Sequence, residues 1–124
     1  MSGWGWAAFV LAGAVGAPMR YLVDDAVQRR TKGSAPLGTL AVNVTGSFLL
    51  GLVTGLALHH GLSKTGRLVA GTGFCGAYTT FSTLTFETVR LLEDGRYATA
   101  GRVLIATLVV CGLAAAAGIG LGSI

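Results

Sequence analysis

Residues 73–87 read GFCGAYTTFSTLTFE and interrupt a chain that is otherwise rich in apolar side chains. The stretch holds four threonines, one serine and two glycines, where a membrane-spanning helix would carry leucine or another large apolar residue. Glycine weakens a helix, and lipid offers no hydrogen-bond partner to exposed polar groups. The stretch therefore predicts a helix that is broken at membrane depth.

Backbone that leaves the helix at that depth is stable only where protein or an aqueous cavity covers it. Freed carbonyl oxygens are ligands for a hard cation such as Na⁺. Hydroxyl donors and the positive edges of aromatic rings suit an anion instead. A threonine-rich kink, whose hydroxyls bond to preceding carbonyls, explains the same residues equally well. The residues alone favour neither interpretation.

The rest of the chain predicts an all-α membrane protein. Of its 124 residues 52% are hydrophobic, and only nine Lys/Arg and five Asp/Glu are present. The charges leave four uncharged runs, at 1–19, 33–63, 68–86 and 103–124. Because about 20 apolar residues cross a bilayer, we expect a single four-span domain over residues 1–124. The predicted spans are about 3–23, 36–60, 67–92 and 98–122.

The first run is expected to stay as a span rather than to be cleaved as a signal peptide. No basic residue precedes its apolar part, whereas a signal peptide begins with a basic region. Trp4 and Trp6 are typical of an aromatic anchor at the membrane interface.

The basic residues predict the orientation. With four spans, both termini lie on one side of the membrane, and loops one and three lie on the other. These two loops and their flanks carry seven basic residues, against two in loop two: Arg20, Arg29, Arg30, Lys32, Arg90, Arg96 and Arg102. The positive-inside rule places loops one and three in the cytoplasm. We expect the protein in the cell membrane of a prokaryote, in contact with lipid.

Three polar residues mark the second span. Thr39, Asn43 and Ser47 stand four residues apart and so share one helix face. Asn43 is the costly one, because its amide offers donors and an acceptor that lipid cannot satisfy. It either bonds to a neighbouring helix or lines a pathway, and both interpretations stay open at this point.

Small residues also follow helical spacing. Gly51 and Gly55 in the second span, and Ala114, Gly118 and Gly122 in the fourth, lie four residues apart. Such faces let helices approach closely in lipid. Four spans of this size cannot enclose a pathway alone, so we expect an oligomer.

Other function classes fit less well. The sequence contains no recognisable nucleophile–base pair and no metal-ligand set, so we expect no enzyme. The net charge of +4 is explained by topology rather than by nucleic acid. A small four-span multidrug exporter is the weaker alternative, because proton-coupled export needs an embedded carboxylate and the four uncharged runs contain none.

Three motifs give the chain a resemblance to the Fluc family of fluoride channels, also called CrcB. They are GAPMRY (16–21), GTLAVNVTGSFLLG (38–51) and GFCGAYTTFSTLTFE (73–87), in the family's order and spacing. The resemblance implies an antiparallel dimer with two fluoride pores and a structural sodium ion at its centre. It also implies passive export of fluoride from the cytoplasm.

The resemblance assigns roles to individual residues. Backbone carbonyls of Gly76 and Thr79 would hold the sodium ion. The fluoride pore would be lined by Asn43, Phe81, Ser82, Thr83 and Leu84, and Arg20, Thr39 and Ser47 would have vestibule or structural roles.

Two departures from the family pattern matter. The family has a pair of phenylalanines whose ring edges face fluoride, but the second position is Leu84 here. In the fourth span, where the family usually has a tyrosine and serines, the alignment places Arg102, Ala106 and Val110, with Thr107 nearby. Together with the charge bias, which favours one orientation, these departures favour a heterodimer with an oppositely oriented paralogue over a homodimer. A non-conducting subunit that depends on such a partner is a further alternative.

Overall fold

The computed structural model describes residues 1–31 and 36–124, and this part of the chain contains helices and no strands. In chain order the elements are α1 (Gly3–Thr31), α2 (Leu37–His59), α3 (Lys64–Arg67), the π-helical η1 (Leu68–Cys75), α4 (Gly76–Tyr78), α5 (Ser82–Glu93) and α6 (Tyr97–Gly122). The predicted all-α fold is confirmed. Lys32, one of the basic residues assigned to loop one, lies outside the described residues.

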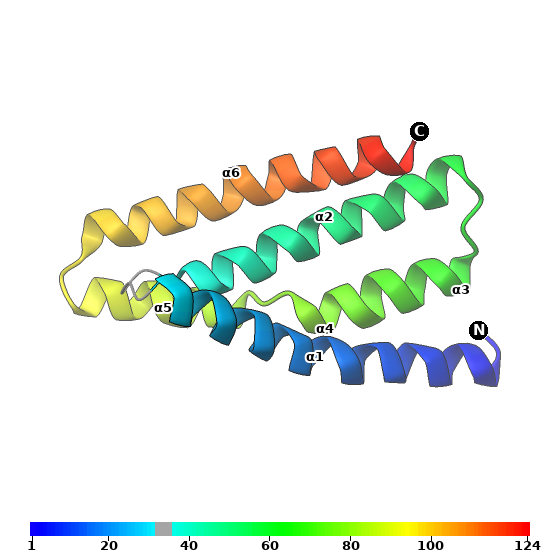
Figure 1. Ribbon diagram of the computed structural model, residues 1–124, viewed down its shortest axis with the longest axis horizontal. Helices are drawn as coiled ribbons and strands as arrows, with labels where there is room; N and C mark the ends of the chain where they lie inside the picture. The colour runs from blue at the N-terminus through cyan, green and yellow to red at the C-terminus, as the bar shows by residue number, and fades with distance from the viewer. Residues whose placement is uncertain (32–35) are drawn as a thin grey trace.

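The helices run along the long axis of an extended bundle (Figure 1). α2 packs along α6 on one side and contacts α1 and η1 on the other, while α1 lies against η1 and α4. The two termini and the α2–α3 connection lie toward one end of the bundle, and the α5–α6 turn lies at the other end (Figure 1).

Three helices of the described residues, α1, α2 and α6, are long and apolar enough to cross a membrane. The third predicted span, 67–92, falls on α3 to α5, where no single helix reaches that length. The count of four spans therefore stays a prediction. α1 continues to Thr31, past the predicted end of the first span at residue 23. In this charged part, Arg29 Nε lies 3.0 Å from Asp25 Oδ2 one turn earlier.

The segment from α3 to α5 is broken near its middle, as predicted. α4 ends at Tyr78, Thr79 has extended backbone (φ −77°, ψ 159°), and α5 begins at Ser82. The glycines expected to weaken the helix do not lie at the break itself. Gly73 is inside η1, and Gly76 has helical backbone (φ −63°, ψ −36°).

Gly73 instead allows two helices to touch. A Cβ added to it would lie 3.1 Å from the carbonyl oxygen of Phe9 in α1. Gly16 of α1 meets the same interface, because a Cβ there would lie 2.7 Å from the carbonyl oxygen of Phe74. The backbones of α1 and η1 therefore approach closely, and at Gly16 a side chain could not be added without moving the backbone of Phe74. Close packing and helix weakening favour the same residue, so the sequence alone could not show that Gly73 allows this contact.

The small residues of α2 and α6 pack against each other within one chain. A Cβ added to Gly51 would overlap the backbone of Ala115, and one added to Gly118 would overlap the carbonyl oxygen of Phe48. A Cβ on Gly55 would lie 3.0 Å from the Cα of Gly122. The predicted close approach is confirmed at Gly51, Gly55, Gly118 and Gly122, whereas Gly51 meets Ala115 rather than the predicted Ala114. These contacts join two helices of the same chain and so do not argue for an oligomer.

Replacement of Gly118 by alanine is expected to destabilise the protein by about 1–3 kcal/mol, because α2 and α6 must separate to admit the methyl group. Gly120→Ala is the matched control, since a Cβ at that position of the same helix meets nothing within 4 Å. Thermal unfolding in detergent would measure both. Equal unfolding midpoints for the two variants would contradict the packing that is described here.

Candidate functional site

The site begins where the side chain of Asn43 meets the break. Asn43 Nδ2 donates to the carbonyl oxygen of Thr80 at 2.9 Å, and the N–H of Thr80 donates to Asn43 Oδ1 at 2.9 Å. Both residues are buried, with exposed fractions of 7% and 9%. One amide side chain therefore satisfies two backbone groups that the interrupted helix leaves without partners.

Thr80 also bonds to the first turn of α5, the helix that follows the break. Its Oγ1 accepts a hydrogen bond from the N–H of Thr83 at 3.2 Å, in the manner of a helix-capping hydroxyl. Thr80 Oγ1 in turn donates to Thr83 Oγ1 at 3.1 Å. Thr80 was not among the predicted site residues. Its position directly after the first threonine of the break was the available signal.

A second contact between α2 and α5 lies two turns away from the break. Thr39, which is 1% exposed, donates from Oγ1 to Glu87 Oε1 at 2.9 Å. The other carboxyl oxygen, Glu87 Oε2, is buried and has no hydrogen-bond partner among the described residues. A buried carboxylate with one free oxygen is energetically costly, so this contact brings a polar group into the helix bundle. Glu87 was not among the predicted site residues.

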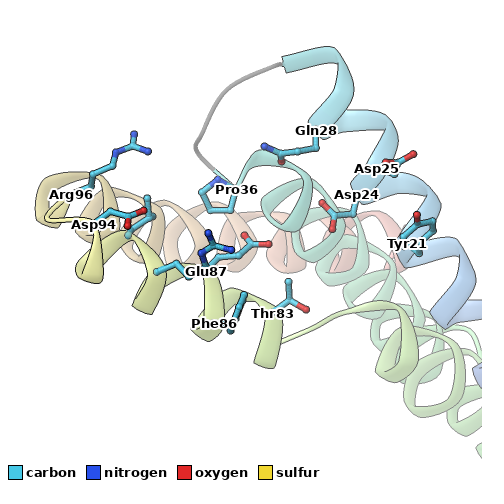
Figure 2. Close-up of a pocket in the computed structure, with 12 residues that line it drawn as sticks. Tyr21, Asp24, Asp25, Gln28, Pro36, Thr83, Phe86, Glu87, Asp94 and Arg96 are labelled. Atoms are coloured by element: carbon cyan, nitrogen blue, oxygen red, sulfur yellow. The ribbon is translucent and has the colours of Figure 1, made fainter.

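Three cavities follow one another from the charged end of the bundle to the break. The first, about 620 Å³, lies between α1 and α5 and is lined mainly by polar and charged side chains (Figure 2). Asp24 from α1 and Glu87 from α5 face the space from opposite sides (Figure 2). The second, about 210 Å³, is lined by Arg20, Tyr21, Asp24, Thr39, Val42, Thr80 and Thr83.

The third cavity is an open groove of about 700 Å³ between α2, the break and α6. Its polar lining includes Asn43, Ser47 and Thr107, and the rest is mostly apolar. Neighbouring cavities share residues: Thr83 lines the first and second, and Thr80 lines the second and third. The pair of Asn43 and Thr80 thus stands between a polar cavity and a mostly apolar groove.

Most of the predicted site residues meet along this series. Arg20, Thr39 and Thr83 line the second cavity, and Asn43, Ser47, Thr79, Phe81 and Leu84 line the groove. Ser82 and Gly76 line none of the three cavities. Ser82 is exposed, and its Oγ lies 3.5 Å from Thr80 Oγ1.

The two positions of the expected ring pair differ sharply in exposure. Phe81 is 79% exposed and its ring stands on the surface of the groove, whereas Leu84 is 8% exposed. On α6 the groove is lined by Leu104, Thr107, Leu108, Cys111 and Gly112. Of the fourth-span residues named from the resemblance, Thr107 lines this groove, whereas Arg102, Ala106 and Val110 do not.

Comparison with known proteins places the chain in a family. A family model described as "CrcB-like protein, Camphor Resistance (CrcB)" matches residues 7–119. The chain belongs to the CrcB family. The resemblance that was inferred from the three motifs is therefore confirmed.

The CrcB relatives carry names that describe ion channels, not enzymes. Fluoride-specific ion channel FluC 1 of Leifsonia xyli is 53% identical over 90 residues, which cover 73% of this chain and 66% of that protein. FluC 2 of Mycobacterium bovis is 50% identical over 111 residues, covering 90% and 84%. FluC 1 of Streptomyces avermitilis is 50% identical over 108 residues, covering 86% of each chain.

The sodium site that the CrcB resemblance implies can be compared with the hydrogen bonds of the break. In an unbroken helix, the carbonyl of Gly76 would accept from the N–H of Thr80, and that of Thr79 from the N–H of Thr83. Those two N–H groups donate instead to Asn43 Oδ1 and to Thr80 Oγ1. Both carbonyls thus lose their helix donors, which fits a role as cation ligands.

No group of three or more His, Cys, Asp and Glu side chains in the described residues could hold a metal ion. A cation at the break would therefore rely on backbone oxygens, which are hard ligands suited to Na⁺. A Cβ added to Gly76 meets nothing within 4 Å, so this backbone faces open space. Any cation there would have room for ligands from outside the chain.

Replacement of Asn43 by alanine is expected to destabilise the CrcB fold by about 2 kcal/mol or more, because it leaves the buried N–H and C=O of Thr80 without partners. Chemical or thermal unfolding of the purified protein would measure the loss. Thr54→Val is the control on the same helix, since the Thr54 hydroxyl bonds only to the carbonyl of Leu50. A midpoint for Asn43→Ala equal to that of the control would refute the role given to this amide.

Proposed function

We propose that this chain is a subunit of a fluoride-selective channel that lowers cytoplasmic fluoride by passive export. The observation that carries the proposal is the series of three cavities joined at Thr83 and Thr80. It supplies a route from the charged end of the bundle to the break in the third predicted span. The choice of fluoride as the transported ion rests on the names of the curated relatives, which describe fluoride-specific ion channels.

The groups along the route suit a small, strongly hydrated anion. Asn43 Nδ2 carries two hydrogens and makes one hydrogen bond to the described residues, so one N–H is free to replace water around fluoride. Hydroxyls of Thr39, Thr80 and Thr83 line the preceding cavity. The protons of Thr39 and Thr80 are donated to Glu87 and to Thr83, so the hydroxyl of Thr83 is the one of the three that can donate to the anion. The exposed ring of Phe81 offers a weakly positive edge. Such sites bind weakly enough for an ion to leave as well as to enter.

A partner subunit belongs to the proposal. The groove beside the break is open, and it presents Asn43, Ser47 and non-helical backbone at Thr79 on its surface. Lipid cannot satisfy such groups, so protein is needed to cover them. An antiparallel dimer, with itself or with a paralogue, would close the groove. A sodium ion bound by the carbonyls of Gly76 and Thr79 would lie in the interface.

The proposed setting is the cell membrane, with loops one and three in the cytoplasm. Fluoride enters acid-exposed cells as the neutral acid, dissociates and is trapped as the anion, so that a passive pore lets it leave down its gradient. The carboxyl groups of Asp24 and Glu87 at the first cavity face this ion at the cytoplasmic end. The nearby Arg20 and Arg90 offset part of their charge.

A second candidate is a subunit that conducts only when an oppositely oriented paralogue is present. Leu84, which lines the groove, offers bulk but no ring edge to the anion. The Lys/Arg bias of seven to two favours a single orientation in the membrane. The curated relatives bear the numbered names FluC 1 and FluC 2, which is consistent with paired genes.

Purified protein reconstituted in liposomes is expected to release fluoride rapidly, with no comparable release of chloride. An ion-selective electrode measures the efflux after the membrane potential is clamped with a potassium ionophore. Release by this chain alone supports a homodimer. Folded protein that releases fluoride only after a paralogous subunit is added supports the second candidate. No fluoride release under either condition would refute the channel.

Leu84→Phe is expected to raise the fluoride efflux rate several-fold, because it places a second ring edge beside Phe81 in the groove that both residues line. The matched control is Leu104→Phe, which adds a ring to the same groove from α6. Initial efflux rates at equal protein density would be compared. An equal increase for both variants would show that bulk, rather than the position of the ring, changes the rate.

A further inference from the structure

Tyr78 is the last helical residue before the break, and no role has been assigned to it so far. Its side chain is buried, with 5% of its surface exposed. Its hydroxyl lies 2.8 Å from Oγ1 of Thr45 in α2. Among the described residues, Thr45 is the one hydrogen-bond partner of this hydroxyl, which therefore links the residue before the break directly to the adjacent helix.

The direction of this hydrogen bond follows from the other partners of Thr45. Thr45 Oγ1 lies 2.8 Å from the carbonyl oxygen of Ala41 and 3.1 Å from that of Val42. Carbonyls only accept, so the single hydroxyl proton of Thr45 is donated to them. The hydroxyl of Tyr78 must therefore be the donor to Thr45 Oγ1.

The ring of Tyr78 has little room to move. It stacks on Phe74, with ring centroids 5.6 Å apart and planes 12° apart. A Cβ added to Gly46 of α2 would lie 3.2 Å from Tyr78 Cδ2, and one added to Gly16 of α1 would lie 3.3 Å from the Tyr78 nitrogen. Two glycines thus admit the residue between α1 and α2, and the hydrogen bond to Thr45 then fixes it along the axis of α2.

Two links to α2 consequently bracket Thr79. On the N-terminal side of Thr79, the hydroxyl of Tyr78 bonds to Thr45. On its C-terminal side, the backbone of Thr80 bonds to the side chain of Asn43. The structure contains no cis peptide bonds among the described residues. In a trans peptide the carbonyl of Thr79 points opposite to the N–H of Thr80, which is aimed at Asn43. The carbonyl of Thr79 is therefore directed away from the Asn43 side chain.

We propose that Tyr78 is a positioning residue: by donating to Thr45, it holds the backbone ahead of the break so that the carbonyl of Thr79 stays aimed at a bound sodium ion. The inference rests on the sodium site of the proposed function and adds a side chain that determines its affinity. Tyr78 does not touch the ion. It acts by limiting the rotation of the peptide that carries the ligand.

The test compares three single variants of the purified full chain. Tyr78→Phe removes only the hydroxyl and keeps the stacked ring, and Thr45→Val removes the acceptor. Thr54→Val is the control, because its hydroxyl bonds to Leu50 of its own helix, away from the break. The thermal unfolding midpoint is measured against Na⁺ concentration, with N-methylglucamine chloride keeping the ionic strength constant.

The Na⁺ concentration that gives half of the thermal shift is expected to rise roughly two- to tenfold in Tyr78→Phe, the range that one lost hydrogen bond produces. Thr45→Val should give a rise of similar size, and Thr54→Val should give none. The double variant Tyr78→Phe/Thr45→Val should need no higher Na⁺ concentration than the single variant with the higher requirement. Both changes remove the same hydrogen bond, so their effects on Na⁺ affinity should not add. If Tyr78→Phe does not fold, Thr45→Val carries the comparison.

A variant with a lower midpoint at saturating Na⁺ but an unchanged Na⁺ requirement would overturn the inference, since the bond would then serve stability alone. If the unfolding midpoint of the unsubstituted protein does not change with Na⁺ concentration, both the sodium site and this inference are overturned. Fluoride efflux from liposomes made with the same preparation separates that result from failure of the channel. Efflux without a Na⁺ response leaves the channel standing without this site, and absence of efflux removes the channel as well.

Discussion

The pairing of Asn43 with the backbone of Thr80 is the interaction on which the rest of the structure depends. An interrupted helix leaves N–H and C=O groups that neither lipid nor the helix itself can satisfy. The amide side chain of Asn43 forms hydrogen bonds to both the N–H and the C=O of Thr80, each at 2.9 Å. Without it the break would have to close into a continuous helix or recruit water. The two residues of this contact also line the cavities on either side of the break: Thr80 lines both, and Asn43 lines the groove.

The same contact connects stability with function. Because Asn43 accepts the N–H of Thr80, which would otherwise bond to Gly76, the carbonyl of Gly76 is left without its usual helix donor. Because Thr80 Oγ1 takes the N–H of Thr83, the carbonyl of Thr79 is left free as well. The hydrogen bonds that stabilise the break thus create oxygen ligands as a consequence. The remaining N–H of Asn43 is left for the groove, so one side chain serves the fold and the proposed path together.

Much of the fold could be read from the sequence. Alternation of uncharged runs and charged clusters predicted the helices α1, α2 and α6, and the polar residues 73–87 predicted the broken segment. The glycine spacing predicted close approach between α2 and α6, although it did not show that both helices belong to one chain. The sequence could not distinguish between two structural roles that the same residue type can have. Gly73 suits a helix break as well as close contact with α1, and only the structure shows that it serves the contact.

The sequence by itself determined that the chain is an all-α CrcB protein with polar residues concentrated on the second and third predicted spans. These properties depend on composition and local spacing, which a single chain displays directly. Only the tertiary structure decided which polar groups meet. Asn43 and Thr80 are 37 residues apart in sequence, Thr39 and Glu87 are 48 apart, and Thr45 and Tyr78 are 33 apart. Such pairings depend on the rotation and register of one helix against another, and helical periodicity repeats without specifying either.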